Sequence, residues 1–318
     1  MTDRTQVGNG GDVVVAVDVG GTTMKGALVD RSGTAHCSTR VPTDASSGPD
    51  AVLARLLSVV AALREDAVRL GLRTVAAGVA VPGIVDERNG VAGRSINLGW
   101  RDVPVQAILH DTLRLPTAVG QDVRAGALAE ARLGAGRRVG SMVFVPIGTG
   151  IASATVVDGR VLTGARYAAG EIGHGTRATG SPCGCGSFGC LEQVASAAAL
   201  ARRYQERTGR TATSERLSAD VAAGESDAVA VWRDAIEALA DVLAITIAVV
   251  DPDTVVLGGG LSEAGETLLT PLRAAIRARL TADRTPSVVR AELGDQAGCL
   301  GAGLLAFELP SASRGTTT

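Results

Sequence analysis

The stretch that decides the fold is EIGHGTRATGSPCGCGSFGCLE, residues 171–192. Cys183, Cys185 and Cys190 lie within eight residues of one another, and His174 lies nine residues before the first of them. Three thiolates and one imidazole make a closed tetrahedral zinc site of the structural kind. Gly, Ser and Pro fill the spacing, as a tight ligand loop requires. A disulfide would leave one of the three cysteines unpaired, so we predict a structural Zn²⁺ in this loop.

Two glutamates, Glu171 and Glu192, border this loop. The metal does not need them, because four ligands already complete its shell. A clamped loop that presents two carboxylates indicates a binding site for a ligand rich in hydroxyl groups.

The composition limits the classes of function. The chain has 318 residues, enough for two packed domains, and 46% of them are hydrophobic. Aromatic residues make up only 2%, which argues against recognition of bases or sugars by stacking. The net charge is −2 and there is no basic run, so we expect no nucleic-acid partner.

The two ends and the most apolar segment indicate a cytoplasmic protein with no membrane partner. The start, MTDRTQVGNGGD, is polar and glycine-rich, which is typical of a disordered tail rather than a signal peptide. The apolar run 239–250 is too short to span a bilayer and contains Asp241. The end, SASRGTTT, is also expected to be disordered. Cys37 and Cys299 stand alone and are expected to be buried and reduced.

A glycine turn joins two expected strands near the start of the chain, 13–17 and 24–29. A hairpin with this turn is large enough to receive a phosphate. A bare hairpin would not need the turn's aspartate or threonines. Lys25 is the only lysine, and it either contacts a phosphate or reflects a bias toward arginine. The candidate residues are Asp18, Gly20, Gly21, Thr22, Thr23 and Lys25.

The same pattern recurs later in the chain. The expected strand 141–147 ends in Gly148, Thr149 and Gly150, and 151–157 returns from it. This repeat predicts two domains built alike, each with a phosphate-binding hairpin. A third glycine turn, Gly258–Gly259–Gly260, follows the expected strand 254–257 and suits close approach of a nucleotide.

Further polar residues follow expected strand ends. Gly83 follows the strand 74–81, and Asn97 lies in a loop where it could present its amide to a ligand. Gln121 and Asp122 follow the strand 115–119 and precede a helix over 123–133. Asp122 is either the N-cap of that helix or a general base held at its N-terminus, and the pattern leaves both open. The other expected elements are strands 34–41 and 287–293 and helices 49–70, 192–208, 214–223, 226–250, 262–280 and 296–307.

In this order the motifs resemble those of the ROK family of sugar kinases and repressors. The resemblance runs from about residue 13 to 307, and its most specific part is the cysteine cluster with Glu171 and His174. The motifs are Asp18-x-Gly20-Gly21-Thr22, Pro82-Gly83-x-Val85-Asp86, Asn97-Leu98-x-Trp100, Asp122, Glu171-x-Gly173-His174, Cys183-x-Cys185-Gly186-x-x-Gly189-Cys190-Leu191-Glu192 and Gly258-Gly259-Gly260.

The resemblance implies an α/β fold of the actin-like, hexokinase type, with two domains around a central cleft and a structural zinc loop. The domains would be 1–121 with 297–318, and 122–296. The family's kinases move the γ-phosphoryl group of ATP, with Mg²⁺, to the 6-hydroxyl of a hexose. An assembly of identical chains, a dimer or tetramer, is also implied.

Site residues follow by position from the same resemblance. Asp122 would be the catalytic base. The sugar would contact Gly83, Asn97, Gln121, Asp122, Glu171, His174 and Glu192. The nucleotide would contact the turns at 20–23, 148–150 and 258–260. His174 would hold zinc through one ring nitrogen and face the sugar with the other.

Gln121 departs from the family pattern. Family kinases for glucose usually carry Asn-Asp at this place, and that asparagine helps bind hydroxyls on the side of the third and fourth sugar carbons. Glutamine moves the amide outward by one methylene group. We infer either an altered acceptor, such as the amino sugar kanosamine (3-amino-3-deoxyglucose) of antibiotic biosynthesis, or a plain glucokinase in which Gln121 replaces asparagine neutrally.

Other functions are less consistent with the residues. A ROK repressor carries a helix-turn-helix ahead of its sugar-binding part, and only about a dozen polar residues precede the first strand here. Asp122 and three glycine turns argue against a catalytically silent sensor. Other hexoses or N-acylhexosamines as acceptor, and polyphosphate as donor, remain alternatives.

Overall fold

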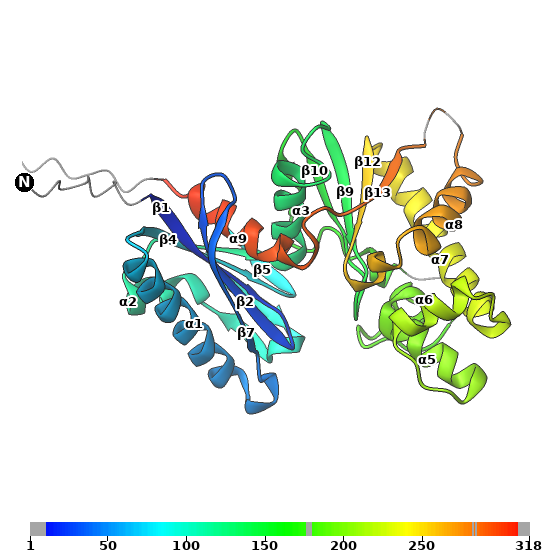
Figure 1. The fold of residues 1–318 in the computed structure, drawn as a ribbon, viewed down its shortest axis with the longest axis horizontal. Helices are drawn as coiled ribbons and strands as arrows, with labels where there is room; N and C mark the ends of the chain where they lie inside the picture. The colour runs from blue at the N-terminus through cyan, green and yellow to red at the C-terminus, as the bar shows by residue number, and fades with distance from the viewer. Residues whose placement is uncertain (1–10, 176–179, 282, 284, 311–318) are drawn as a thin grey trace, which may run out of the picture. The chain divides into compact units, whose positions relative to one another are not determined.

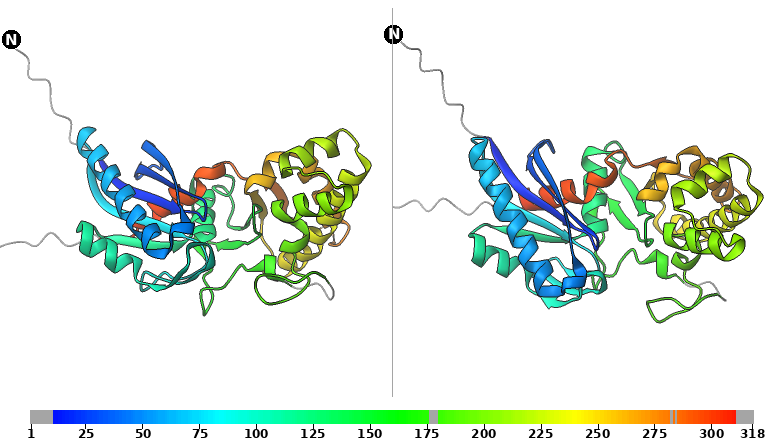
Figure 2. Two further views of the ribbon diagram at one scale, coloured as in Figure 1. Left: turned by 90° about the horizontal axis from the view of Figure 1, so that it is seen from below. Right: turned by 60° about the horizontal axis from the view of Figure 1, so that its bottom comes forward.

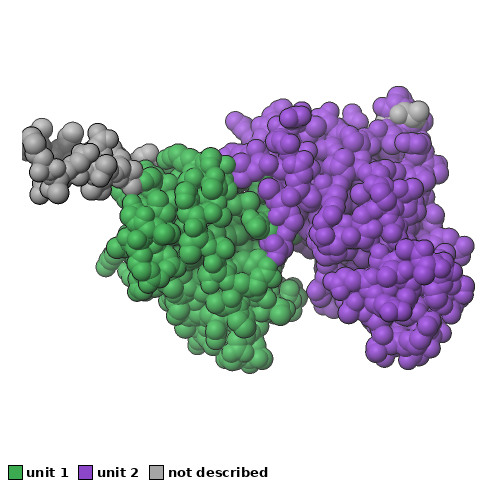
Figure 3. Space-filling model, viewed as in Figure 1, with its two compact units in different colours: residues 1–129, 296–318 green, residues 130–295 purple. Residues whose placement is uncertain are grey.

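The computed structural model describes residues 11–175, 180–281, 283 and 285–310, so most of both expected tails lies outside it. The chain divides into two compact units, Met1–Ala129 with Gln296–Thr318 and Glu130–Asp295 (Figure 3). We call them unit 1 and unit 2. Asp122, expected at the start of the second domain, falls in unit 1, because the residues around it bond to Glu87 of the same unit.

The sheet of unit 1 has the strand order β3-β2-β1-β4-β8 (Figure 1). β2 pairs antiparallel with β1 and β3, whereas β1, β4 and β8 run parallel. The carboxyl ends of the three parallel strands therefore meet at one edge of the sheet, where α/β proteins bind ligands. The strands are β1 (Asp12–Val19), β2 (Thr23–Asp30), β3 (Ala35–Pro42), β4 (Arg73–Val81) and β8 (Thr117–Gln121).

Helices cover both faces of this sheet (Figures 1 and 2). On one face, α1 (Pro49–Arg69) packs its apolar stripe against alternate residues of β1. On the other face α9 (Ala297–Phe307) lies so close to β4 that a Cβ on Gly78 would be 1.8 Å from the carbonyl oxygen of Ala302. Cys299 of α9 is buried as predicted, whereas Cys37 in β3 is only half-buried.

A small antiparallel sheet and one helix of unit 1 were not predicted. The sheet has the order β5-β6-β7, and its strands are Ile84–Asp86, Val91–Ser95 and Trp100–Val103. Helix α2 (Val105–Leu113) follows. These strands have three to five residues each and mix Gly, Arg and Ser with few apolar residues, so they show no clear period.

The sheet of unit 2 repeats the first one. Its order is β11-β10-β9-β12-β13, with β10 antiparallel to β9 and β11, and with β9, β12 and β13 parallel. Order and direction match unit 1 strand for strand, so the predicted internal repeat is confirmed. The strands are β9 (Ser141–Pro146), β10 (Ala154–Val157), β11 (Arg160–Val161), β12 (Thr254–Gly258) and β13 (Ser287–Arg290).

Two expected helices of unit 2 are shorter than predicted. The expected helix 192–208 breaks at Ser196, whose backbone is extended and whose side chain accepts from the backbone N–H of Ala199, capping the next helix. The expected helix 262–280 begins only after Gly265, which has φ +55°. The helices are α3 (Asp122–Leu133, shared with unit 1), α4 (Glu192–Ala195), α5 (Ala197–Thr208), α6 (Ser214–Ala222), α7 (Ser226–Val250) and α8 (Glu266–Arg277).

Across the described part of the chain, none of these helices is both long and apolar enough to cross a membrane.

A buried carboxylate joins α3 to the end of the second sheet. Glu130 is 0% exposed and accepts from the backbone N–H groups of Ala135 at 2.9 Å, Glu292 at 3.2 Å and Leu293 at 2.8 Å. Glu130→Ala would leave three partly buried backbone N–H groups without this acceptor. We expect it to lower the free energy of unfolding by about 3–5 kcal/mol.

The measurement is a urea unfolding curve, with Glu206→Ala as control. The Glu206 side chain is 60% exposed and pairs only across one helical turn with Arg202, so its loss is expected to change stability by less than about 0.5 kcal/mol. Equal effects of the two substitutions would show that Glu130 does not fasten these segments.

Candidate active site

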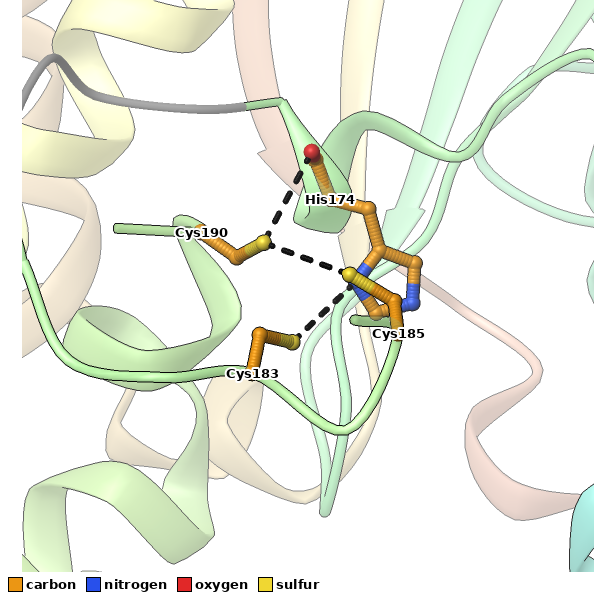
Figure 4. A group of neighbouring side chains, drawn as sticks. All are labelled: His174, Cys183, Cys185 and Cys190. Carbon is orange, nitrogen blue, oxygen red and sulfur yellow. Dashed lines mark hydrogen bonds between the residues drawn. The ribbon is translucent and has the colours of Figure 1, made fainter. Parts of the chain in front are cut away.

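The four predicted metal ligands come together in unit 2 (Figure 4). The ligand atoms of His174, Cys183, Cys185 and Cys190 all lie within 4.8 Å of one another. Cys183 Sγ is 3.7 Å from His174 Nδ1, and Cys185 Sγ is 3.6 Å from Cys190 Sγ. A tetrahedral zinc with bonds of about 2.0–2.3 Å needs ligand atoms roughly 3.3–3.8 Å apart. The cluster therefore fits the geometry of a zinc ion.

The electrostatics of the cluster agree with a metal site. Burial, followed by the neighbouring Cys183 and Cys185, raises the pKa of Cys190 to about 12. A metal cation held between these sulfurs would stabilise the thiolate form of the buried Cys183 and Cys190. Gln193 adds a donor, with its Nε2 3.8 Å from Cys183 Sγ.

Close backbone packing positions the start of the zinc loop. A Cβ on Gly173 would lie 2.0 Å from the carbonyl oxygen of Ile151, and one on Gly170 would lie 1.9 Å from that of Ser153. Ser153 also donates from its backbone N–H to the carbonyl oxygen of Gly170 at 2.7 Å. The loop therefore lies directly against the strand that returns from the glycine turn of unit 2. Residues 176–179 of the loop lie outside the described residues.

The two bordering glutamates differ in their surroundings. Glu171 is exposed, and its Oε2 lies 3.9 Å from His174 Nε2, the ring nitrogen that does not face the cysteines. Glu192 is half-buried, and its Oε2 accepts from the backbone N–H of Ile151 at 3.0 Å. A Cβ on Gly150 would lie 2.5 Å from the same oxygen. Glu192 thus ties the zinc loop to the Gly148–Thr149–Gly150 turn.

Two of the three predicted nucleotide turns lie side by side in unit 2. Ile147, just before Gly148, donates to the carbonyl oxygen of Gly258 at 2.9 Å and accepts from the backbone N–H of Leu261 at 3.0 Å. Gly259 has φ +74°, and a Cβ there would lie 2.5 Å from the carbonyl oxygen of Ile147. A small cavity of about 110 Å³ adjoins Gly260, between it and the start of α6.

In unit 1 the strand register gathers three predicted residues at one edge. Asp18 of β1 pairs with Ala80 of β4, and Val81 of β4 pairs with Gln121 of β8. Asp18, Gly83 and Asp122 therefore all lie at the carboxyl edge of this sheet. Gly83 has φ +99°, and a Cβ there would lie 2.2 Å from the carbonyl oxygen of Arg94.

The first glycine turn lies at the same edge. A Cβ on Gly21 would lie 3.1 Å from the Cβ of Asn97, so the turn and the predicted sugar-binding amide are neighbours. Thr43 Oγ1 donates to the carbonyl oxygen of Gly20 at 2.6 Å and holds the turn from the other side. The carboxyl carbon of Asp18 lies 2.8 Å from where a Cβ on Gly298 would stand, at the N-terminal end of α9, which stabilises negative charge.

The side chains of Gln121 and Asp122 make different contacts at the start of α3. Asp122 is the first residue of the helix, and its Oδ1 accepts from the backbone N–H of Val123 at 2.8 Å and from Gln121 Nε2 at 2.6 Å. Gln121 Oε1 accepts from the backbone N–H of Arg124 at 2.8 Å, which is a capping bond. The sequence left two roles open for Asp122, N-cap or general base, and the capping bond is made by Gln121. Gln121 is only 7% exposed.

Sequence reasoning missed two residues behind this junction. Glu87 Oε1 accepts from Arg124 Nε at 2.7 Å and from the backbone N–H of Gln121 at 3.0 Å. The two side chains belong to segments far apart in the sequence. A signal was present only in part: an acidic residue directly follows Asp86, and an arginine stands on the first turn of a predicted helix.

Comparison with known proteins identifies the family. The profile of the ROK family matches residues 14–308. The chain belongs to the ROK family. The resemblance drawn from the zinc loop and the glycine turns is thereby confirmed, as is the α/β fold of the hexokinase type.

Individual ROK proteins agree with this over almost the full length. A glucokinase from Halalkalibacterium halodurans is 32% identical over 326 residues, covering 96% of each chain. The crystal structure of a ROK hexokinase from Thermus thermophilus has a TM-score of 0.81 at 35% identity and covers 93% of this chain and 98% of its own. A ROK glucokinase from Streptomyces griseus, solved with glucose and AMPPNP, has a TM-score of 0.80 at 28% identity and covers 93% and 99%.

Proposed function

We propose that this sugar kinase of the ROK family transfers the γ-phosphoryl group of ATP to the 6-hydroxyl of glucose, with Asp122 as general base. The observation that carries the proposal is the geometry of Asp122. Its Oδ1 is fixed by two donors at the carboxyl edge of a parallel sheet, where Asp18 and Gly83 also lie. A carboxylate oriented in this way is suited to accept a proton from a bound hydroxyl.

The chemistry follows from the parts that each unit supplies. Phosphoryl transfer needs mainly positioning and neutralisation of charge. The backbone N–H groups of the turns at 20–23, 148–150 and 258–260 are the proposed donors to ATP phosphates, with Thr22, Thr23, Thr149 and Lys25 beside them. Asp18 would hold Mg²⁺, which supplies positive charge at the phosphates when it is bound. Asp122 would take the proton as the sugar oxygen attacks the γ-phosphorus, in line with the departing ADP.

The proposed sugar-binding residues follow the family pattern within each unit. In unit 1 they are Gly83, Asn97, Gln121 and Asp122, and in unit 2 they are Glu171, His174 and Glu192. In unit 2 the zinc would have no chemical part in transfer. It would fix His174 Nδ1, so that Nε2 and the neighbouring Glu171 keep one orientation toward sugar hydroxyls.

An amino sugar such as kanosamine is the second candidate acceptor. Two features would suit a cationic group on the sugar. One is Gln121 in place of asparagine, and the other is the set of carboxylates of Glu171, Glu192 and Asp122. However, the Gln121 amide already bonds to Asp122 and to the start of α3, which gives its additional methylene group a structural use. This contact favours glucose.

The test is steady-state turnover with ATP, comparing glucose with 3-amino-3-deoxyglucose. We expect kcat/KM for glucose to exceed that for the amino sugar by about tenfold or more, because a buried unmatched polar group costs about 1–3 kcal/mol. The reverse preference would make the amino sugar the substrate. N-acetylmannosamine as a third acceptor and polyphosphate as a second donor complete the panel, and faster turnover of either would overturn the corresponding half of the proposal.

A further inference from the structure

We propose that the ion pair between Glu87 and the buried Arg124 is a positioning device for catalysis, which holds the Asp122 carboxylate in one orientation through Gln121. This inference rests on the proposed function, because it assumes that Asp122 is the base. It assigns a role to two residues that neither touch the reacting atoms nor belong to the zinc loop or the glycine turns.

The pair encloses the Gln121–Asp122 junction from both sides. Glu87 Oε1 accepts from the backbone N–H of Gln121 at 3.0 Å, just before Asp122, and from Arg124 Nε at 2.7 Å, just after it. Arg124 also donates from Nη2 to the carbonyl oxygen of Val85 at 3.4 Å. One carboxylate oxygen thus fixes both ends of the segment that carries the proposed base.

Burial makes this arrangement rigid. The side chain of Arg124 is 4% exposed and that of Glu87 is 23% exposed. Separating the pair is costly, because the Arg124 guanidinium would then lie in the interior without the Glu87 carboxylate. The segment 121–124 therefore has little freedom to rotate or shift.

The rigidity passes to Asp122 through specific contacts. The ion pair fixes the backbone N–H of Gln121 and the start of α3. The side-chain amide of Gln121 is then held at both ends: its Oε1 accepts from the Arg124 N–H, and its Nε2 donates to Asp122 Oδ1. Asp122 Oδ1 also accepts from the Val123 N–H. These two donors to Asp122 Oδ1, Gln121 Nε2 and the Val123 N–H, both belong to residues that the ion pair flanks. Glu87 directly follows β5, so the pair also couples Asp122 to the segment that begins at Gly83.

Kinetics can distinguish an ion pair that only stabilises the fold from one that positions Asp122. Loss of a purely stabilising pair lowers the free energy of unfolding and leaves kcat unchanged in molecules that remain folded. Loss of a positioning pair lowers kcat, because misplacing a catalytic group by about 1 Å can cost on the order of 10²-fold in rate. It leaves the KM for sugar nearly unchanged, because ground-state binding does not depend on the exact aim of the base.

The experiment compares kcat and KM for glucose in Glu87→Ala and Arg124→Ala with those of Glu130→Gln, at a temperature where circular dichroism shows each to be folded. Glu130 is the matched control, a fully buried carboxylate that accepts three backbone N–H groups in unit 2. We expect kcat to fall by about 10- to 100-fold in the first two variants, with KM changed by less than about threefold. Glu130→Gln should lose stability and keep kcat within about twofold of the unmodified enzyme.

A second variant keeps the inference testable if the single substitutions prevent folding. Glu87→Gln/Arg124→Gln removes both charges together, which avoids an unpaired buried ion. Its kcat should still fall by about tenfold. A kcat within about twofold of the unmodified enzyme, in this variant or in a folded Glu87→Ala, would overturn the inference.

Combination with Asp122→Asn separates this inference from the proposed function. If the pair acts through Asp122, adding Glu87→Ala to Asp122→Asn should change the residual single-turnover rate by less than about twofold. A full additive loss would contradict the inference. Full activity in Asp122→Asn alone would instead contradict the proposed base. If Asp122→Asn is inactive while the Glu87 and Arg124 variants keep full kcat, Asp122 remains the proposed base and only the positioning role of the ion pair is contradicted.

Discussion

Asp122→Asn is expected to lower kcat by about 10²–10⁴-fold, the range for loss of a general base. Asparagine keeps the size of the side chain and its oxygen, so it still accepts from the Val123 N–H and leaves the start of α3 intact. It cannot take a proton from the attacking hydroxyl. The KM for glucose should change by less than about threefold, because the amide would keep the proposed hydrogen bond to the sugar.

The measurement is a coupled assay of ADP release at saturating glucose, with Asp111→Asn as the control. Asp111 is an exposed aspartate of unit 1, near the end of α2, and lies outside the proposed machinery. Its substitution should leave kcat within about twofold of the unmodified enzyme. An Asp122→Asn enzyme with more than about a tenth of the original kcat would show that another group accepts the proton.

Cys190→Ser is expected to remove zinc and to raise the KM for glucose by about 10- to 100-fold. Cys190 is 0% exposed, and its Sγ is 3.6 Å from Cys185 Sγ. Serine therefore removes one buried thiolate from the four predicted ligands. Without the metal the loop no longer fixes His174 and Glu171. Loss of one charge-assisted hydrogen bond to a sugar hydroxyl, worth about 1.5–3 kcal/mol, accounts for the expected change.

Metal content and kinetics should be measured on the same samples. The unmodified protein should contain about one zinc ion per chain, and the variant almost none. Cys37→Ser is the matched control, since Cys37 lies in β3 of unit 1 and is not one of the four clustered ligands. A variant without zinc but with an unchanged KM would show that the loop does not orient sugar-binding residues.

The regular elements could be predicted because their patterns are strong. Buried runs such as Val13–Val17 and glycine turns such as 148–150 can be recognised from the sequence alone. Their repeated order of strand, turn and strand predicted the matching sheets. The zinc cluster was equally accessible, since three of its four ligands are neighbours in sequence. Short polar strands such as β6, by contrast, depend on their partners and carry no period of their own.

The arrangement around Asp122 could not be derived from the sequence. The nearest charged contact behind it joins Glu87 and Arg124, which are 37 residues apart. Gln121 caps α3 through one bond, in which its Oε1 accepts from the Arg124 N–H. A sequence pattern does not distinguish this cap from one made by Asp122. Such choices are decided by tertiary packing.

The most direct test of the account is the identity of the product. The unmodified enzyme is incubated with ATP and glucose labelled with carbon-13, and the sugar is followed by carbon and phosphorus nuclear magnetic resonance. We expect stoichiometric formation of glucose 6-phosphate and ADP, with phosphorus coupling at the sixth carbon. Phosphate on another carbon, or release of inorganic phosphate without a phosphorylated sugar, would contradict the account.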